Sequence, residues 1–327
     1  MPASQRASAQ RRLRRIIVTL VSVAATLGFG YTAICLVIAT QLVYVPQVPI
    51  KETPAALNLS YRDVTFPSRD DHVQLKGWLI PGVLPDGTLT TKRTIILVHG
   101  TRTNRSDPAA GLLNLSGDLA RQGFAVLAFD MRGMGESPPA PLSLGYFEQR
   151  DVLGAYDFLH SGTPPYPELG RPQAIGGWGV SMGGATLLMA AAQEPGIQAV
   201  VSDAAYADIV PILERVVPQT TKFPIFTPGV LVAAQALYGM NFYAVRPVDI
   251  VAKIAPRPIF FIQGTRDGYI PFANMATLAN AARQGNGAQV QTWAAPGSDH
   301  AQSYNDHRQE YVQRITAFYT AALGPAT

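Results

Sequence analysis

The first fifty residues carry one long apolar run. From residue 16 to residue 50 the chain has no Asp, Glu, Lys or Arg, and residues 16–40 are almost wholly apolar. At a rise of about 1.5 Å per residue, these 25 residues would cover about 37 Å as a helix, enough to cross a hydrocarbon layer of about 30 Å. Backbone groups within lipid must bond inside their own segment, so the run is predicted to be helical. We expect a transmembrane helix within residues 16–45, ended by Pro46.

Beyond residue 60 the apolar runs are short. The run His72–Ile80 alternates polar and apolar residues, as in a half-solvated antiparallel strand, and Tyr61–Phe66 is a second strand-like run before it. Six later runs are continuously apolar and mostly separated by helix-length segments, which indicates a parallel sheet covered on both faces. These runs are Thr94–Val98, Phe124–Phe129, Ala174–Trp178, Ile197–Val201, Pro258–Ile262 and Val290–Ala294, and the helical segments include Ala109–Gln122, Gly145–His160 and Met182–Ala192. The pattern predicts an α/β fold with a mostly parallel sheet of about eight strands.

Two segments do not fit this alternation. Residues 46–59, with three prolines and short polar residues, are expected to form a stalk before a folded body of residues 60–327. Residues 205–255 hold many large apolar side chains between two predicted strands. They form either a pair of crossover helices that pack on the sheet or a small lid whose apolar face lines a substrate pocket. Both alternatives stay open, because amphipathic packing and pocket lining give the same sequence pattern.

Charge is concentrated at the N-terminus. Residues 1–15 hold five of the 26 Lys and Arg residues and no acid, so the other residues carry 21 basic and 22 acidic side chains. The folded body therefore has no basic excess, and nucleic acid is not an expected partner. Because the basic cluster directly precedes the apolar run, the positive-inside rule predicts a cytoplasmic tail at residues 1–15. The body is then expected on the extracytoplasmic side, which is the periplasmic side of a bacterial inner membrane.

Export followed by cleavage is the alternative to a permanent anchor. A cleaved signal peptide has an apolar region of about 7–15 residues and a small-x-small exit, and neither is evident here. Arg11-Arg12 or Arg14-Arg15 could serve twin-arginine export, but their flanks match that signal poorly. Cys35, the single cysteine, lies in mid-span after a large residue, which does not fit a lipoprotein signal. We therefore expect an uncleaved signal anchor.

The strongest chemical signal is the pattern Gly179-x-Ser181-x-Gly183, which follows a predicted strand and opens a predicted helix. This context is typical of a nucleophile elbow, in which a strained turn projects a serine from the sheet. The flanking positions need glycine because a Cβ there would collide with the neighbouring strand and helix. The backbone N–H of Met182, at the helix start, is a candidate oxyanion donor. The second donor is expected at the backbone N–H of Thr101, after the first parallel strand.

A serine nucleophile needs a base and an orienting acid, and in this arrangement the acid precedes the histidine along the chain. Of the five histidines only His300 and His307 come late enough, and His300 directly follows the last predicted strand. We expect His300 as the base and Asp267, in a loop after a strand, as the acid. Asp203 is the alternative acid. Asp299 is disfavoured, because neighbours in sequence rarely form an in-line hydrogen bond.

Other polar residues near these loops receive no chemical role. Arg102 and Arg105 could attract an anionic substrate, but we expect them on a solvated surface. His160, at the end of a predicted helix, is expected to cap that helix or lie on the surface. No cluster of metal ligands is evident in the sequence.

Together these pieces resemble the α/β-hydrolase superfamily, and within it the bacterial serine hydrolases of the dienelactone hydrolase-like, prolyl oligopeptidase-like and fermentation/respiration-switch-like group. The motifs that carry the resemblance are His99-Gly100, Asp130–Ser137, Gly179–Gly183, Gly264–Pro271 and His300–Gln302. They span nearly all of the folded body. The resemblance implies the α/β-hydrolase fold and a Ser-His-Asp hydrolase that needs no metal or organic cofactor. Asp130 and Arg132 are similar to a structural loop signature of that group and are not assigned to catalysis.

The expected function is cleavage of an ester-like bond through an acyl-enzyme. The substrate would be a small-molecule ester or acyl compound, and a lipid-like one if residues 205–255 form an apolar lid near the bilayer. A serine peptidase of the prolyl oligopeptidase-like type is the main alternative. Such relatives often carry a large N-terminal propeller, whereas only about 50 residues separate the span from the first parallel strand. A catalytically inactive binding module with this fold is a further alternative, disfavoured because serine, acid and histidine are all present in order.

Overall fold

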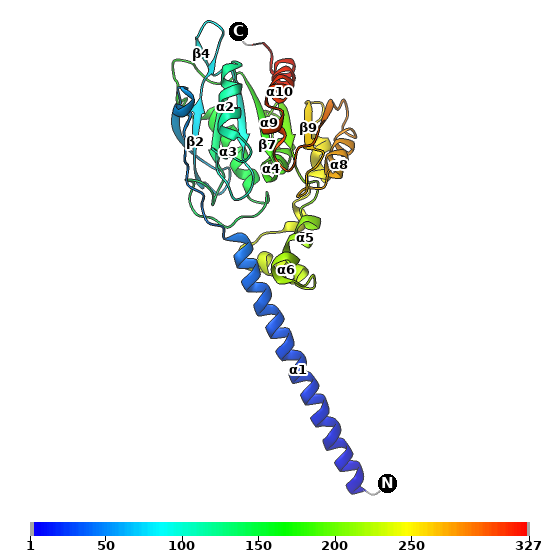
Figure 1. The fold of residues 1–327 in the computed structure, drawn as a ribbon. Coiled ribbons are helices and arrows are strands. Elements are labelled where there is room, and N and C mark those ends of the chain that lie inside the picture. Colours follow the sequence, from blue (N-terminus) through cyan, green and yellow to red (C-terminus); the bar gives the residue numbers. More distant parts are fainter. Residues whose placement is uncertain (1–2, 326–327) are drawn as a thin grey trace. The chain divides into compact units, whose positions relative to one another are not determined.

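The computed structural model describes residues 3–325, which form two compact units (Figure 1). One combines the chain up to Val43 with Leu213–Gly239, and we refer to it as the helical unit. The other combines Tyr44–Ile212 with the chain from Met240 onward, and we refer to it as the sheet unit. Each unit is described by itself.

The sheet unit is built on one eight-stranded sheet. In spatial order its strands are β1 (Arg62–Pro67), β2 (Gln74–Ile80), β6 (Ala125–Asp130), β5 (Arg93–Val98), β7 (Ala174–Val180), β8 (Ala199–Asp203), β9 (Ile259–Gly264) and β10 (Val290–Ala295). The pairs β1–β2 and β2–β6 are antiparallel and the other neighbours are parallel. The predicted mixed α/β sheet is therefore confirmed. A two-stranded hairpin, β3 (Gly82–Val83) with β4 (Leu89–Thr90), was not predicted.

Helices cover both faces of this sheet, as predicted. Ile95 and Leu97 of β5 belong to a buried core that also takes in apolar residues of α2 and α10. On the other face α4 lies between β7, β8 and α3, and all ten of its residues are buried. The helices of this unit are α2 (Leu112–Arg121), α3 (Glu148–Ser161), α4 (Met182–Ala191), α7 (Pro247–Ile250), α8 (Ala273–Ala282), α9 (Ser303–Asp306) and α10 (Arg308–Leu323), with short 3-10 turns η1 (Pro54–Leu57), η2 (Phe242–Ala244) and η3 (Val251–Ile254). Continuous burial on both faces explains why the parallel strands are apolar along their whole length.

Residues 46–59, expected to form a stalk, lie along the sheet unit. The side-chain amide of Gln47 donates a hydrogen bond of 2.6 Å to the carbonyl of Ser137. The amide of Asn104 donates to the carbonyl of Val48 at 3.0 Å. Ile50 packs against the buried core, as do two leucines close to η1. The segment therefore contributes to the packing of the sheet unit from Gln47 onward.

The helical unit consists of a long helix and a packed apolar segment. Helix α1 (Ala3–Val43) begins in the basic tail and continues through the apolar run. Among the described residues, one helix is both long enough and apolar enough to cross a membrane, and it covers Ser8–Val43. Helix α6 (Phe226–Tyr238) packs against α1. The preceding helix, α5 (Val210–Thr221), contains the boundary between the two units. The predicted apolar helix is confirmed, and it extends further toward the N-terminus than the apolar run itself.

A buried ion pair fixes the loops after β5 and β6. The Arg105 guanidinium is 2% exposed and pairs with the fully buried Asp130 carboxylate. Asp130 also accepts the backbone N–H groups of Arg105, at 2.7 Å, and of Glu136, at 2.9 Å. The guanidinium carbon lies 4.2 Å from the ring centre of Trp78. The expectation that Arg105 lies on a solvated surface is wrong, because its charge is matched inside the fold by Asp130.

The junction between β7 and α4 is a crowded turn of the sheet unit. Ser181 has φ 56° and ψ −123°, a conformation that side chains rarely adopt. A Cβ added to Gly179 would lie 2.5 Å from the carbonyl oxygen of Gly183. A Cβ added to Gly183 would lie 2.3 Å from the carbonyl oxygens of Val98 and His99 at the end of β5. These distances confirm that neither glycine position has space for a side chain.

We expect Gly183→Ala to lower the free energy of unfolding by about 1–3 kcal/mol, because the added methyl group meets rigid backbone rather than a movable side chain. The measurement is the denaturant midpoint of the full-length protein in detergent. Gly268→Ala is the matched control, since the nearest atom to a Cβ there is 3.8 Å away. Equal midpoints for the two variants would contradict the packing argument.

Candidate active site

Three side chains from separate loops meet at the carboxyl edge of the sheet. Ser181 follows β7, Asp267 follows β9 and His300 follows β10. The distance from His300 Nε2 to Ser181 Oγ is 2.9 Å, and that from His300 Nδ1 to Asp267 Oδ2 is also 2.9 Å. The carboxyl ends of parallel strands share one edge of a sheet, which is how residues more than a hundred positions apart become neighbours. The structure therefore brings together the three residues singled out in the sequence.

The Asp267 carboxylate is buried and its orientation is fixed from both sides. Its Oδ1 accepts the backbone N–H groups of Tyr269, at 2.9 Å, and of Ile270, at 2.8 Å. Its Oδ2 accepts the side-chain amide of Gln263 at 2.8 Å in addition to the imidazole. Because a carboxylate only accepts, the facing His300 nitrogen must be a donor. In the neutral imidazole, that assignment leaves the lone pair of Nε2 directed at the Ser181 hydroxyl.

Asp299, disfavoured in the sequence, has a different role from Asp267. Its Oδ1 accepts the backbone N–H of Gly268 at 3.0 Å and that of His300 at 2.7 Å. These two donors lower the pKa of Asp299. The residue therefore ties the loop after β9 to the loop after β10 through backbone groups, and both loops carry a candidate site residue.

Asp203, the alternative acid, lies in the buried interior of the sheet unit. Its Oδ2 accepts the Tyr311 hydroxyl at 2.9 Å, and Ser303 Oγ lies 3.4 Å from its Oδ1. Trp178 Nε1 donates to the same Tyr311 oxygen at 2.8 Å. Burial raises the pKa of Asp203 to about 7. Asp203 thus belongs to a buried hydrogen-bond chain and makes no hydrogen bond to the His300 ring.

The other histidines have partners elsewhere. His307 Nε2 donates to the carbonyl of Pro296 at 2.8 Å, and its ring lies against Trp293. His99 is fully buried, its Nε2 accepts the backbone N–H of Met131 at 3.0 Å, and burial lowers the pKa of its imidazole. His160, in the last turn of α3, stacks on Tyr156 with ring centres 5.4 Å apart. His72 was expected within the second strand, but it lies just before β2 begins at Gln74.

One expected oxyanion donor follows the serine in the chain, and the other lies in the loop after β5, which passes beside the serine. Met182 is the first residue of α4, so its N–H has no acceptor one turn earlier in the helix. A Cβ built on Gly100 would lie 3.6 Å from Ser181 Cβ, so the loop after β5 passes directly beside the elbow. Thr101 follows in that loop, and its Oγ1 is buried with no hydrogen-bond partner among the described residues. The donor role of the two N–H groups stays a prediction.

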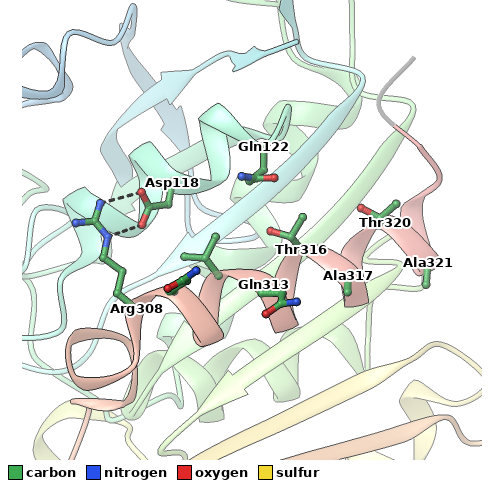
Figure 2. Close-up of a pocket in the computed structure, with 10 residues that line it drawn as sticks. Asp118, Gln122, Arg308, Gln313, Thr316, Ala317, Thr320 and Ala321 are labelled. Carbon is green, nitrogen blue, oxygen red and sulfur yellow. Dashed lines mark hydrogen bonds and ion pairs between the residues drawn. The ribbon is translucent and has the colours of Figure 1, made fainter. Parts of the chain in front are cut away.

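A cavity of about 1060 Å³ lies away from this site, between α2 and α10 (Figure 2). At one end Arg308 forms two hydrogen bonds of 2.8 Å to Asp118. The lining is otherwise mostly Gln, Thr and Ala side chains. None of its residues belongs to the three loops that carry Ser181, Asp267 and His300. Among the residues that the structure describes, no group of three or more His, Cys, Asp or Glu side chains could hold a metal ion.

Comparison with known proteins gives a family and several relatives. The profile of the prolyl oligopeptidase family matches residues 117–326. The uncharacterised protein YfhR of Escherichia coli K12 is 26% identical over 271 residues, which cover 81% of this chain and 83% of YfhR. The uncharacterised protein YqkD of Bacillus subtilis is 27% identical over 233 residues, which cover 70% of this chain and 71% of YqkD. The similarity to both relatives therefore extends over most of their length.

Solved structures share the fold at low sequence identity. The Pyrococcus furiosus esterase Pf2001 superposes with a TM-score of 0.69 at 22% identity, over 86% of this chain and 99% of that one. The acylaminoacyl peptidase of Pyrococcus horikoshii superposes with a TM-score of 0.60 at 17% identity, over 85% of this chain but 45% of that one. The strand order, the elbow and the matched profile agree with these likenesses. The chain belongs to the prolyl oligopeptidase family and is a serine hydrolase with the α/β-hydrolase fold.

Proposed function

We propose that the protein is a membrane-anchored serine esterase in which Ser181 is the nucleophile, His300 the general base and Asp267 the orienting acid. The observation that carries this proposal is the pair of 2.9 Å distances that link the three side chains through the His300 ring. A serine hydroxyl becomes an effective nucleophile only when a base within hydrogen-bond reach takes its proton. The strained conformation of Ser181 is in keeping with the role, since strain is concentrated at functional sites.

The proposed reaction is acyl transfer in two steps. Ser181 Oγ attacks the ester carbonyl carbon while its proton moves to His300 Nε2, and the carbonyl oxygen becomes an oxyanion. The N–H groups of Met182 and Thr101 would stabilise that oxyanion. Collapse of the tetrahedral species releases the alcohol, which takes the proton from the imidazolium. Water, deprotonated by the same imidazole, then attacks the acyl-enzyme, and the acid is released as Ser181 Oγ takes the proton back from the imidazolium. Asp267 keeps Nδ1 protonated throughout.

An ester is preferred to a peptide as the substrate. The chain covers nearly all of the Pyrococcus furiosus esterase but less than half of the acylaminoacyl peptidase. Peptide cleavage stays the second candidate, because the family is that of prolyl oligopeptidase. Both reactions use the same nucleophile and base, so the choice depends on the leaving group and on access to the site.

The anchor is the second part of the proposal. Helix α1 is proposed to cross the membrane with its basic end in the cytoplasm, which leaves the sheet unit on the extracytoplasmic side. Its described residues are almost entirely exposed along the N-terminal two thirds of the helix, as expected for a segment covered by lipid. The anchored enzyme would then encounter a substrate with an acyl chain close to the bilayer.

Ser181→Ala and His300→Asn are each expected to lower turnover of a short p-nitrophenyl ester by about three orders of magnitude or more, since each removes a member of a unit that acts together. His307→Asn is the matched histidine control, because its ring contacts Pro296 and Trp293 rather than the serine. Labelling with a fluorophosphonate gives a second readout. Full activity or labelling in Ser181→Ala would contradict the assignment, and an inactive wild type that resists the label would indicate a binding module.

Substrate classes are expected to separate by rate. The purified full-length protein should hydrolyse p-nitrophenyl esters with kcat/KM at least about tenfold above that for p-nitroanilides of short blocked peptides, in line with an esterase pocket. A series of acyl lengths tests the lipid-like substrate, for which rates should rise beyond acetyl. Preferential anilide cleavage that depends on Ser181 would instead assign the protein to the peptidases.

Asp203 gives a prediction for the dependence of stability on pH. Its folded pKa of about 7 lies above the ordinary value of 3.8, so between these pH values the folded protein binds more protons than the unfolded chain. Its contribution to stability is complete below about pH 4 and is lost as the pH rises to about 7. In Asp203→Asn this loss should be absent, while the amide oxygen can still accept the Tyr311 hydroxyl. Thermal midpoints of the two proteins measured across this range should therefore converge or cross as the pH rises, and parallel curves would contradict the argument.

A further inference from the structure

The segment after α5 is unusually free of charge. Between Lys222 and Arg246 the chain has no Asp, Glu, Lys or Arg over 23 residues, and α6 lies within this stretch. Apolar helices of this length occur either in protein cores or at membrane interfaces. The sequence pattern fits either crossover helices or a lid, but the contacts of this segment inside the helical unit point to a different role.

Polar groups of α1 find their partners in this segment. The Tyr31 hydroxyl donates a hydrogen bond of 2.9 Å to the carbonyl of Ile225, and its ring stacks on Phe226 with centres 5.4 Å apart. Nine residues later along α1, Thr40 Oγ1 accepts a hydrogen bond of 2.9 Å from the Tyr238 hydroxyl. A hydroxyl group in a membrane span needs a protein partner, because lipid chains offer none. The pairing therefore puts α6 and the C-terminal part of α1 in one shared environment.

The two helices also approach closely, as Figure 1 shows for α6 beside the C-terminal part of α1. A Cβ added to Gly229 would lie 2.5 Å from Cys35 Sγ and 2.6 Å from the Tyr31 hydroxyl. Cys35 and Ala39, one turn apart on α1, are buried. Small residues at a helix contact are typical of packing within membranes, where close approach replaces the hydrophobic effect as the driving force.

The outward side of the segment is mostly apolar and uncovered, with Gln235 as an exposed polar residue of α6. Phe223 and Ile225, in the turn before α6, are 61% and 68% exposed, and Val232 on α6 is 63% exposed. Helix α4 is equally apolar, but all of its residues are buried in the sheet unit. An apolar core helix is thus found in this chain with complete coverage, whereas α6 packs against α1 and keeps part of its surface exposed. Its exposed side needs an apolar solvent.

The length of α1 sets the depth of the contact. A hydrocarbon layer of about 30 Å holds about 20 helical residues, so a span that begins after Arg15 reaches the far boundary near Cys35. Tyr31 then lies about 6 Å inside that boundary and Thr40 about 7 Å beyond it. Because of their hydrogen bonds, the turn at Phe223–Phe226 lies at the depth of Tyr31, and Tyr238 lies at the depth of Thr40. Interfacial segments insert to about this depth, with aromatic residues at the boundary.

We infer that residues 223–239 are a second membrane-inserted element. The turn Phe223–Phe226 enters the leaflet at the C-terminal end of α1, the exposed side of the first turns of α6 contacts the headgroup end of the lipid acyl chains, and the end of α6 lies among the headgroups. Lys222 precedes the turn, and its flexible stem can carry the ammonium group to the headgroups. The inference rests on the proposed anchor role of α1. It assigns residues 223–239 to the membrane rather than to a lid over the active site.

The test uses tryptophan fluorescence of the full-length protein in phosphatidylcholine vesicles. The three native tryptophans, Trp78, Trp178 and Trp293, are at most 7% exposed and lie in the sheet unit. Phe223→Trp and Val232→Trp each add one indole to the segment. Lipids brominated near the headgroup end of their chains should lower total emission of either variant by roughly a quarter, the share of one indole among four, because bromine quenches only indoles that reach the chains. Lipids brominated near the chain ends should quench less.

Thr277→Trp, on an exposed position of α8 in the sheet unit, is the matched control and should not be quenched. Flotation of the vesicles measures the anchor independently, so protein that fails to float would indicate failure of the anchor proposal. Protein that floats while both Phe223→Trp and Val232→Trp are quenched no more than Thr277→Trp would overturn the inference. Shielding of these indoles from aqueous iodide only after fluorophosphonate labelling would also overturn it, in favour of a lid.

Discussion

The packing of backbone against backbone at the β7–α4 junction is the constraint on which the candidate site depends. The carbonyl groups at the end of β5 leave no space beside Gly183, and α4 leaves none beside Gly179. Between them Ser181 takes a positive φ, and its N–H donates to the carbonyl of Asp203 at 2.8 Å. The turn therefore cannot relax without disturbing β5 and β8 together. The hydroxyl is held outward, where the loops after β9 and β10 supply the carboxylate and the imidazole.

Two buried carboxylates near the site illustrate how surroundings divide similar groups between roles. Asp267 accepts hydrogen bonds from two backbone N–H groups, an amide and the His300 ring. Asp203 has the Tyr311 hydroxyl and a long contact to Ser303, and its pKa is raised to about 7 by burial. Several hydrogen-bond donors stabilise the charged form of a carboxylate, which can then pair with an imidazolium. Burial with few donors favours the neutral form instead. Asp267 has the larger set of donors because it lies in the loop after β9.

Much of this arrangement could be predicted from the sequence because it follows from local patterns. Continuous apolar runs predicted the parallel strands, and a serine between two glycines at a strand end predicted the turn now seen at Ser181. The loops that carry Asp267 and His300 follow from the chain order that such a fold imposes. Their catalytic roles, and that of the Thr101 N–H, remain predictions that only activity can test.

What could not be predicted depends on partners far along the chain. Arg105 has the same local surroundings whether it is solvated or paired, and only the folded position of Asp130 decides. The hairpin β3–β4 has two residues in each strand, too few to produce an alternation. Nothing near Phe226 in the sequence indicates that its ring meets Tyr31, almost two hundred residues earlier. The segment 205–255 therefore stayed ambiguous, because apolar character gives no information about which surface covers it.

The division of the helical unit between two distant parts of the chain has a practical consequence for truncation. A shortened protein that begins at Tyr44 would lose α1 yet keep Leu213–Gly239, so the contact side of α6 would become uncovered along with its outward side. Such a fragment would expose a larger hydrophobic patch than the whole protein does and would tend to aggregate. A water-soluble version of the sheet unit calls for removal of two segments, the leading helix and Leu213–Gly239, with a polar linker that joins Ile212 to Met240.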